Sequence, residues 1–341
     1  TNVPEFGIGS QTYNEIFGST KNPFDTKLTS GGSSGGAAAA VSTGMIPFAD
    51  GSDMMGSLRN PASFCSVFGY RPTPGLIPSK VTSKIFPKLS TLGPIGKTTK
   101  CLAYLLDAQV GNFFIKKNKN NLFSEIVDKL PKKQIKIAWL GNFNGSYLYE
   151  NEIKEICESF LKKLENHQFK IEDLSLKFNS EIIWESWIDL RSLSLKNDLY
   201  EIFKDKNKVT FLKQEIIWEI ERALTLSNVD YKEAICKRTK WKKYTDLLFN
   251  RFDFLALPST QVFPFLAQVK YPSEINGKNL DTYHRWMEVV VPASLLGLPT
   301  ISIPCGFNTK GLPTGIQIIG KYGNDKEVLC TSNLIEKSKI N

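Results

Sequence analysis

Residues 31–36 read GGSSGG and are followed at once by the alanine run 37–40, and a second Gly-Ser pair lies within GSLRNP, residues 56–61. Gly/Ser tracts are typical of flexible linkers. The alanine run, however, favours a helix that begins directly after the tract. Because a helix N-terminus presents free backbone N–H groups, it suits contact with an oxygen or an anion. The tract is therefore either a linker or an ordered loop that opens a functional helix.

The second stretch, ADGSDMMGSLRNPA at residues 49–62, has different chemistry. Ser57 follows Gly56 in a predicted tight turn, where small neighbours would let a substrate carbonyl approach. The backbone N–H groups of Met54, Met55 and Gly56 would then converge on a developing oxyanion, an arrangement that stabilises acyl-transfer transition states. The alternative is an ordinary turn with no chemical role.

Composition and charge limit the class of protein. The chain has 341 residues, of which 41% are hydrophobic and 23% charged, and no stretch approaches the ~20 apolar residues of a membrane span. The formal net charge is +9, and much of the excess lies within residues 116–133 and 237–243. Since no arginine-rich arm, zinc finger or stacking motif accompanies these clusters, a solvated surface is favoured over a nucleic-acid site. We expect neither a nucleic-acid nor a membrane partner.

The six cysteines follow no CxxC or other metal-ligand spacing. We therefore expect no metal and no disulfide framework, which favours a reducing, cytoplasmic compartment. Cys157 falls on the apolar face of a predicted helix, so burial as a small hydrophobic side chain is expected.

Hydrophobic periodicity predicts an α/β fold. A strand, a helix and a strand follow one another within about forty residues, a pattern that favours a parallel βαβ unit. The region of about 175–250 reads as a helical insertion in a single domain. The predicted helices are 36–43, 98–110 (ended by Gly111) and 151–166; the predicted strands and buried segments are 46–49, 64–70, 135–140, 169–174, 252–257, 300–304 and 315–319.

The two glycine-serine stretches together resemble the signature of the amidase signature family. FGYRPTPGLIP, VPASLLGLPTISIPCGF and GLPTGIQIIG are similar to that family as well. The resemblance covers residues 1–110 and 250–335, whereas the middle of the chain is similar only in its pattern of elements. It implies one domain over residues 1–341, with a mixed β-sheet core flanked by α-helices.

The resemblance also implies a Ser–Ser–Lys triad and an amide hydrolase. Ser57 would be the nucleophile that forms an acyl-enzyme, and Ser33, preceded by a cis peptide bond after Gly32, would relay the proton of Ser57 to a neutral lysine. Ser34 would support the site by hydrogen bonding.

Two further residues of the second stretch, Asp53 and Arg59, would form a structural ion pair beneath the oxyanion turn. We expect them to brace this turn and to take no part in the reaction.

The lysine departs from the family pattern. In the family it lies several dozen residues before the bridging serine, but only thirty-two residues precede Ser33 here, and Lys21 and Lys27 are too close to match. We therefore expect an N-terminally truncated chain whose lysine lies outside it, with little activity on its own. A Ser–His arrangement with His284 is a remote alternative.

The Met54-Met55 pair resembles the branch of 6-aminohexanoate-cyclic-dimer hydrolase-like bacterial amidases. Two methionines would give the acyl pocket an adaptable apolar lining, to which Trp286 and Met287 would add. We expect a small aliphatic or mixed amide as substrate, no cofactor, and an assembly that admits a homodimer. The A subunit of a glutamine-dependent amidotransferase and a non-catalytic amidase-like remnant are the alternatives.

Overall fold

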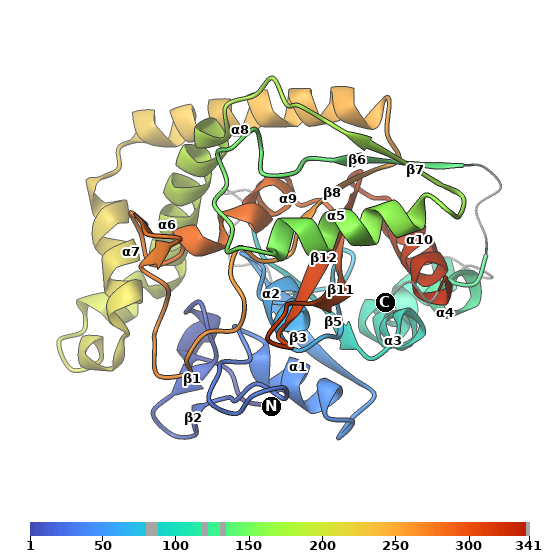
Figure 1. Cartoon of the computed structure of the whole chain (residues 1–341). Helices are drawn as coiled ribbons and strands as arrows, with labels where there is room; N and C mark the ends of the chain where they lie inside the picture. Colours follow the sequence, from blue (N-terminus) through green and yellow to red (C-terminus); the bar gives the residue numbers. More distant parts are fainter. Residues whose placement is uncertain (80–87, 118–121, 130–133, 339–341) are drawn as a thin grey trace.

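The computed structural model describes residues 1–79, 88–117, 122–129 and 134–338, without the side chains of 112–117. Its centre is an eight-stranded mixed sheet in the order β3-β5-β4-β11-β12-β8-β6-β7 (Figure 1). Neighbouring strands are antiparallel from β3 to β8, and β8, β6 and β7 are parallel. The α/β fold with a mixed sheet is confirmed. The strands are β3 (Phe48–Asp53), β4 (Phe68–Arg71), β5 (Thr91–Gly96), β6 (Ile135–Trp139), β7 (Phe169–Asp173), β8 (Phe254–Pro258), β11 (Thr300–Phe307) and β12 (Pro313–Gly320).

The predicted βαβ unit is present. Between β6 and β7 lies α5 (Ile153–Leu164), and the two strands pair in parallel. The buried side chains of α5 recur at helical spacing along one face, and they include Cys157, which is fully buried as expected. In Figure 1, α5 crosses in front of the sheet.

The two faces of the sheet bury different clusters because side chains alternate along a strand. In β8, Phe254 and Ala256 face a cluster shared with α3 (Thr99–Lys117), α5 and α10 (Asp325–Lys337). Leu255 and Leu257 of the same strand face a second cluster, which involves α9 (Val291–Leu296) and the helical region. The sheet is thus covered on both faces, and α4 (Phe123–Ile126) adds to the first cluster.

The region expected to be helical contains α6 (Ser180–Lys204), α7 (Gln214–Thr225) and α8 (Asn228–Phe249). The side chain of Asn179 caps α6, and Ser227 and Asp230 form a capping box at the start of α8. Both α7 and α8 pack against α6. Short elements complete the fold: η1 (Glu5–Gly7), β1 (Tyr13–Asn14), β2 (Gly18–Ser19), α1 (Gly35–Ser42), α2 (Arg59–Phe64), η2 (Val209–Phe211), β9 (Glu274–Ile275), β10 (Lys278–Asn279) and η3 (Arg285–Val290).

Two element boundaries differ from the sequence prediction. The strand expected at 46–49 is β3, which begins at Phe48 and continues to Asp53. The segment 64–70 is divided between the end of α2 and the start of β4, with Ser66 at a positive φ of 51° between them. The end predicted at Gly111 is confirmed, because its φ of 74° and ψ of 174° break the helical backbone there; a second helical segment, included in α3, continues from it to Lys117. Hydrophobicity alone does not locate the turn at Ser66, since the segment around it is as apolar as the elements it joins.

The basic cluster at 237–243 is a surface engaged in local contacts. Lys237 lies 3.0 Å from Glu185 and 2.9 Å from Glu233, Lys242 pairs with an acid one turn further along α8, and Arg238 donates to the Leu295 carbonyl. Much of the other basic cluster, 116–133, lies outside the described residues. In the described part of the chain, no helix combines the length and the apolar character that a membrane span needs.

Candidate active site

Ser33 and Ser57 come from two different loops and line the same cavity, whose volume is about 210 Å³. Ser33 precedes α1, whereas Ser57 lies between β3 and α2. The backbone N–H of Ser34 donates to the Ser57 carbonyl at 3.2 Å and so joins the two loops. Ser33 is 3% exposed and Ser57 is half-buried. The tertiary structure therefore brings the two predicted serines together.

The loop at 31–36 is ordered, and the linker interpretation is wrong. The Thr12 hydroxyl lies 2.9 Å from the Gly31 carbonyl oxygen and 3.0 Å from that of Ser33, and it accepts the N–H of Gly35 at 2.9 Å. The Gly32–Ser33 peptide bond is cis, as the resemblance implies. A Cβ on Gly32 would lie 2.5 Å from the backbone of Gln11, so close packing requires glycine there.

Ser34 holds the end of β3 beside this loop. Its hydroxyl accepts the N–H of Ser52 at 3.3 Å and lies 3.4 Å from the Ser52 carbonyl oxygen. These contacts place Ser34 next to the catalytic candidates without exposing it to the cavity lined by Ser33 and Ser57. Its geometry suits the supporting role that the resemblance implies.

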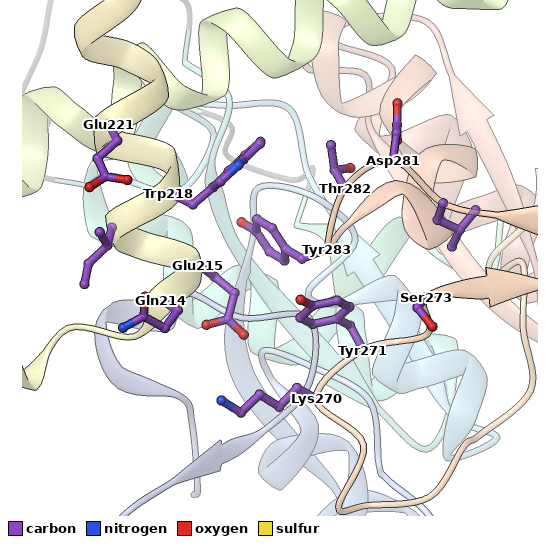
Figure 2. A pocket seen from close by; sticks show the side chains of 12 residues that line it. Gln214, Glu215, Trp218, Glu221, Lys270, Tyr271, Ser273, Asp281, Thr282 and Tyr283 are labelled. Atoms are coloured by element: carbon purple, nitrogen blue, oxygen red, sulfur yellow. The ribbon is translucent and has the colours of Figure 1, made fainter.

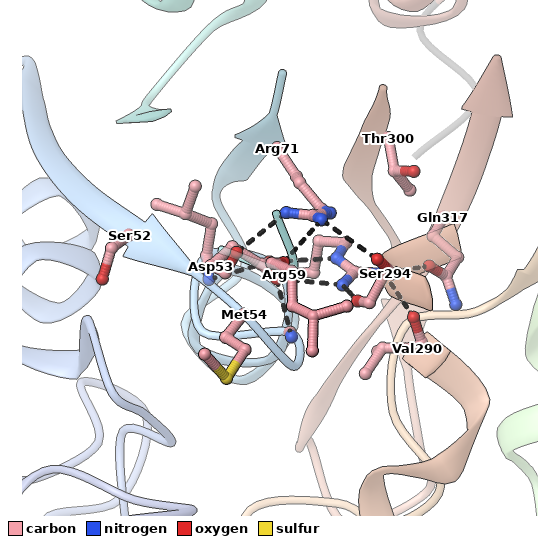
Figure 3. A network of polar contacts seen from close by, with 12 residues as sticks. Ser52, Asp53, Met54, Arg59, Arg71, Val290, Ser294, Thr300 and Gln317 are labelled. Carbon is pink, nitrogen blue, oxygen red and sulfur yellow. Dashed lines mark hydrogen bonds and ion pairs between the residues drawn. The ribbon is translucent and has the colours of Figure 1, made fainter. Parts of the chain in front are cut away.

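The ion pair expected between Asp53 and Arg59 is present, with 3.0 Å between Oδ1 and Nη2 and both side chains fully buried. The guanidinium uses all five of its N–H donors, and the carboxylate accepts two backbone N–H groups besides (Figure 3). The further partners of the pair are the N–H groups of Gly56 and Leu58, the Val290 carbonyl, and the side chains of Ser294 and Gln317.

The buried charge of Asp53 is compensated by two arginine side chains. Burial opposes ionisation of Asp53, but the charges of Arg59 and Arg71 and the hydrogen bonds from Arg59 and the Gly56 N–H together hold the carboxyl pKa below its usual value. Arg71 lies on the other side and donates to the Asp53 carbonyl oxygen at 2.8 Å. Burial lowers the pKa of Arg71 to about 10, and the Asp53 carboxylate partly offsets this effect. The network thus clamps both ends of the turn before Ser57.

In the turn before Ser57, one of the three N–H groups predicted to bind the oxyanion is directed elsewhere. Gly56 adopts a φ of 81°, and its N–H donates to Asp53 Oδ1 at 2.8 Å. Because an N–H donor points along one direction, the Gly56 donor is occupied by the carboxylate, contrary to our expectation. Met54 and Met55 both line the cavity, as we predicted for the acyl pocket.

Helix α6 closes the cavity over the serines with side chains that the sequence analysis missed. Arg191, Leu195 and Asp198 line it from α6, and Tyr283 and Met287 line it from the segment that leads into and forms η3. Trp187, Arg191 and Leu195 are each four residues apart, so a charged residue stands in the buried stripe of a helix. A charged residue in an otherwise apolar stripe is the sequence feature from which this part of the cavity lining could have been predicted.

Arg191 is held in a buried polar cluster. Its Nε lies 2.7 Å from Glu219 Oε1, and Nη2 lies 3.0 Å from the Tyr283 hydroxyl. The Tyr283 hydroxyl also donates to Glu219, at 2.8 Å. The remaining contact of the guanidinium is Nη1 with the Met54 sulfur at 3.1 Å, and a thioether is a weak acceptor. The cluster is therefore less completely paired than the one around Arg59.

Two sequence interpretations of this side are wrong. Trp286 does not line the cavity but is fully buried, stacked on Phe64 at 6.3 Å and edge-on to Phe265 at 5.4 Å. His284 likewise does not line it and packs between Trp184 and Tyr283. Burial lowers the pKa of His284 well below its ordinary value, with the nearby arginines adding to the effect. A Ser–His pair does not form.

No lysine is among the described residues that line the cavity. Lys21 and Lys27, which the sequence analysis set aside, lie elsewhere in the N-terminal region. Within the described part of the chain, the hydroxyls of Ser33 and Ser57 have no hydrogen-bond partner.

Comparisons with known proteins agree with this geometry. A family model described as Amidase matches residues 1–329. The chain is 30% identical over 362 residues to the A subunit of glutamyl-tRNA(Gln) amidotransferase from Natranaerobius thermophilus, covering 99% of this chain and 72% of the relative. It is 32% identical over 370 residues to the protein of the same name from Prochlorococcus marinus, covering 99% and 73%.

Solved structures show the same fold. A bacterial aryl acylamidase superposes with a TM-score of 0.86 at 25% identity, over 100% of this chain and 72% of that one. The A subunit of the Thermotoga maritima glutamyl-tRNA(Gln) amidotransferase gives 0.78 at 29% identity, over 98% and 72%. A 6-aminohexanoate cyclic dimer hydrolase gives 0.81 at 21% identity, over 99% and 74%, which shows the fold alone. With its two serines in one cavity and the family model matched almost end to end, the chain belongs to the amidase signature family and is an enzyme of the class that hydrolyses C–N bonds.

Proposed function

We propose that this protein hydrolyses a carboxylic amide through an acyl-enzyme on Ser57. The observation that carries the proposal is the shared cavity of Ser33 and Ser57, whose loops are joined by the Ser34 N–H and the Ser57 carbonyl. Two serines from separate loops have no packing reason to meet in a cavity. They suit a nucleophile and a group that relays its proton.

In the proposed reaction the Ser57 oxygen attacks the amide carbonyl carbon while its proton passes through Ser33 to a base. The C–N bond then breaks, and the amine leaves with a proton returned along the same path. A water molecule attacks the resulting ester, which releases the carboxylate and restores the Ser57 hydroxyl. We assign stabilisation of the oxyanion to the backbone N–H groups of Met54 and Met55, since Gly56 donates to Asp53.

By the resemblance, the base is a lysine outside residues 1–341. The intact mass of the protein made from its own gene tests this assignment. A product clearly larger than 38.3 kDa, with a lysine several dozen residues before Ser33, supports it. A native product without such a lysine favours the non-catalytic remnant.

The nucleophile is tested with a fluorophosphonate probe and a panel of small amides, using the protein made from its own gene. Ser57→Ala should abolish both labelling and turnover, and Ser33→Ala should lower both by at least about 100-fold, the lower range of proton-transfer catalysis. Ser146→Ala is the matched control, because Ser146 is exposed on a loop away from the cavity. Labelling that persists in Ser57→Ala would exclude Ser57 as nucleophile.

A second candidate function is that of the A subunit in a glutamine-dependent amidotransferase. The relatives with that name are 30–32% identical across 99% of this chain, which is the observation in its favour. It predicts that partner proteins co-purify with the native protein and that turnover requires glutamine. Turnover of simple amides by the isolated native protein, without partners, would favour the free-standing amidase.

A further inference from the structure

A second, larger cavity of about 560 Å³ lies beside the serine cavity. It is formed between α7 and the segment 270–283, and Tyr283 lines both cavities. Figure 2 shows the Tyr283 ring above its centre, with Glu215 and Tyr271 facing each other beneath. A ligand in the serine cavity would thus meet the second cavity at Tyr283.

Three aromatic rings form adjoining walls of this cavity. The Trp218 and Tyr283 ring centroids lie 5.8 Å apart at an interplanar angle of 84°. Those of Tyr271 and Tyr283 lie 6.0 Å apart at 63°. Steeply inclined rings present π faces and edges to one enclosed volume, and a π face attracts a cation.

The carboxylate of Glu215 supplies the charge. Glu215 is 6% exposed, and its Oε1 lies 3.4 Å from the Tyr13 hydroxyl. Its Oε2 is buried and has no hydrogen-bond partner among the described residues. A buried carboxylate oxygen without a partner is costly, and a positive charge beside it would offset that cost.

The rim of the cavity reinforces the sign of this charge. Glu221 and Asp281 are exposed carboxylates at its edge, and Lys270 is the cation opposite them. Asp281 also lies 3.7 Å from Arg285. Three carboxylates against one lining ammonium favour a cationic ligand over an anionic one.

We propose that this cavity binds an organic ammonium group, with the cation against Trp218, Tyr271 and Tyr283 and its charge opposite Glu215. This inference stands without the proposed function. Where the proposed function also holds, the shared Tyr283 makes amides that carry an ammonium group on one side of the scissile bond the preferred substrates.

The first test measures binding by isothermal titration calorimetry, with choline as the probe and neutral 3,3-dimethylbutan-1-ol as its uncharged isostere. Choline should bind at least about 10-fold more tightly, the factor that one desolvated cation–π contact supplies. Equal affinity of the two compounds would overturn the proposal. Because no bond is broken, the result does not depend on Ser57.

Variants then locate the site. Glu215→Gln keeps the shape of the side chain and should weaken choline by about 10-fold or more, as loss of a buried charge partner does. Glu155→Gln removes the same charge from an exposed position on α5 and should leave the affinity unchanged. Choline affinity that survives Glu215→Gln would exclude this cavity.

Trp218→Leu provides an independent reading if Glu215→Gln does not fold, which far-UV circular dichroism would reveal. It should lose choline binding to a similar extent, because an aliphatic side chain has no π face. Tyr271→Phe keeps the ring and should retain binding. If all variants bind choline equally, the cation lies elsewhere.

The link to catalysis has a separate readout. In Glu215→Gln, KM should rise for an amide that carries a terminal ammonium group and stay constant for its uncharged analogue. If neither amide is hydrolysed while choline still binds, the proposed function fails and the cation site stands. If both amides respond equally, the cavity is not part of the substrate path.

Discussion

Two buried arginines on either side of the serine cavity show how differently the same residue is used. Arg59, beneath the turn, directs all five N–H donors to Asp53, Val290, Ser294 and Gln317 (Figure 3). Arg191, on α6, has Glu219, Tyr283 and a methionine sulfur, and it lines the cavity. The first network is complete and holds a backbone in place. The second is less completely paired and borders the cavity.

The comparison extends to neighbouring groups. Around Asp53 each carboxylate oxygen has two donors, whereas the side formed by α6 and α7 contains Glu215 with a partnerless oxygen and His284 with two partnerless nitrogens in the described structure. Buried polar atoms without partners are uncommon in folded proteins. Such atoms also occur beside the Asp53 network, at Arg71 Nε and in the Asn60 amide, so the two sides differ in how completely Arg59 and Arg191 are paired and not in where partnerless atoms lie.

We expect the largest effect from a substitution in the Asp53–Arg59 network. Asp53→Asn leaves the Arg59 guanidinium buried without its charge partner and should lower the free energy of unfolding by about 3–5 kcal/mol. Urea unfolding measures this loss, with Glu155→Gln as the exposed control. An unchanged unfolding midpoint would contradict the bracing role. The pKa of Asp53 in the folded protein lies below its usual value. The ion pair therefore stabilises the folded state at every pH above the ordinary carboxyl pKa. That stabilisation is lost as the pH falls through the lowered pKa of the folded protein.

The equivalent change in the cluster of Arg191, Glu219 and Tyr283 should lower the free energy of unfolding by a smaller amount. Glu219→Gln removes the partner of Arg191, but that guanidinium borders the cavity and keeps its contact with Tyr283. We expect a loss of about 2 kcal/mol, typical of a hydrogen bond to a charged group. The same urea measurement applies. A loss equal to that of Asp53→Asn would remove the distinction between the two networks.

The pH dependence of stability gives a further test on the helical side, at Glu288. Burial raises the pKa of Glu288 to about 8, an effect that Arg285, 3.1 Å away, only partly offsets. The folded state then binds more protons than the unfolded state between the ordinary carboxyl pKa and about 8, so stability falls as pH rises through this window. Between pH 6 and 7 the contribution is about 1.4 kcal/mol.

Glu288→Gln should remove that slope, and thermal unfolding at several pH values would measure the difference from the unmodified protein. Identical slopes in both proteins would show that Glu288 titrates normally. Glu155→Gln again controls for the removal of one carboxylate.

The smallest expected effect tests the contact between the Ser34 hydroxyl and the end of β3. Ser34→Ala removes the hydroxyl contacts with the Ser52 backbone at 3.3 and 3.4 Å. We expect a loss of about 1 kcal/mol in unfolding free energy. The fluorophosphonate labelling rate of Ser57 should fall as well, because β3 leads directly into its turn. A stability loss without any change in labelling would confine Ser34 to a packing role.

Much of the framework was predictable because its signals are local. The parallel pair β6 and β7 and the buried face of α5 follow from hydrophobic periodicity over short windows. The Asp53–Arg59 pair and the cis bond before Ser33 came with the family motifs. The turn at Ser66 was not predictable, since the segment 64–70, which it divides between α2 and β4, is largely apolar on both sides of it.

The sequence by itself determined the family, the two serines and the elements that carry them, because these rest on contiguous motifs and on periodicity. Only the tertiary structure decided which side chains share the cavity. Arg191 lies 134 residues from Ser57 and Tyr283 lies 92 residues from Arg191, yet all three line it. It also moved Trp286 and His284 into the core and left Glu215 facing three aromatic rings. Such contacts depend on the docking of α6 and α7 onto the sheet domain, a packing of distant surfaces that no local pattern encodes.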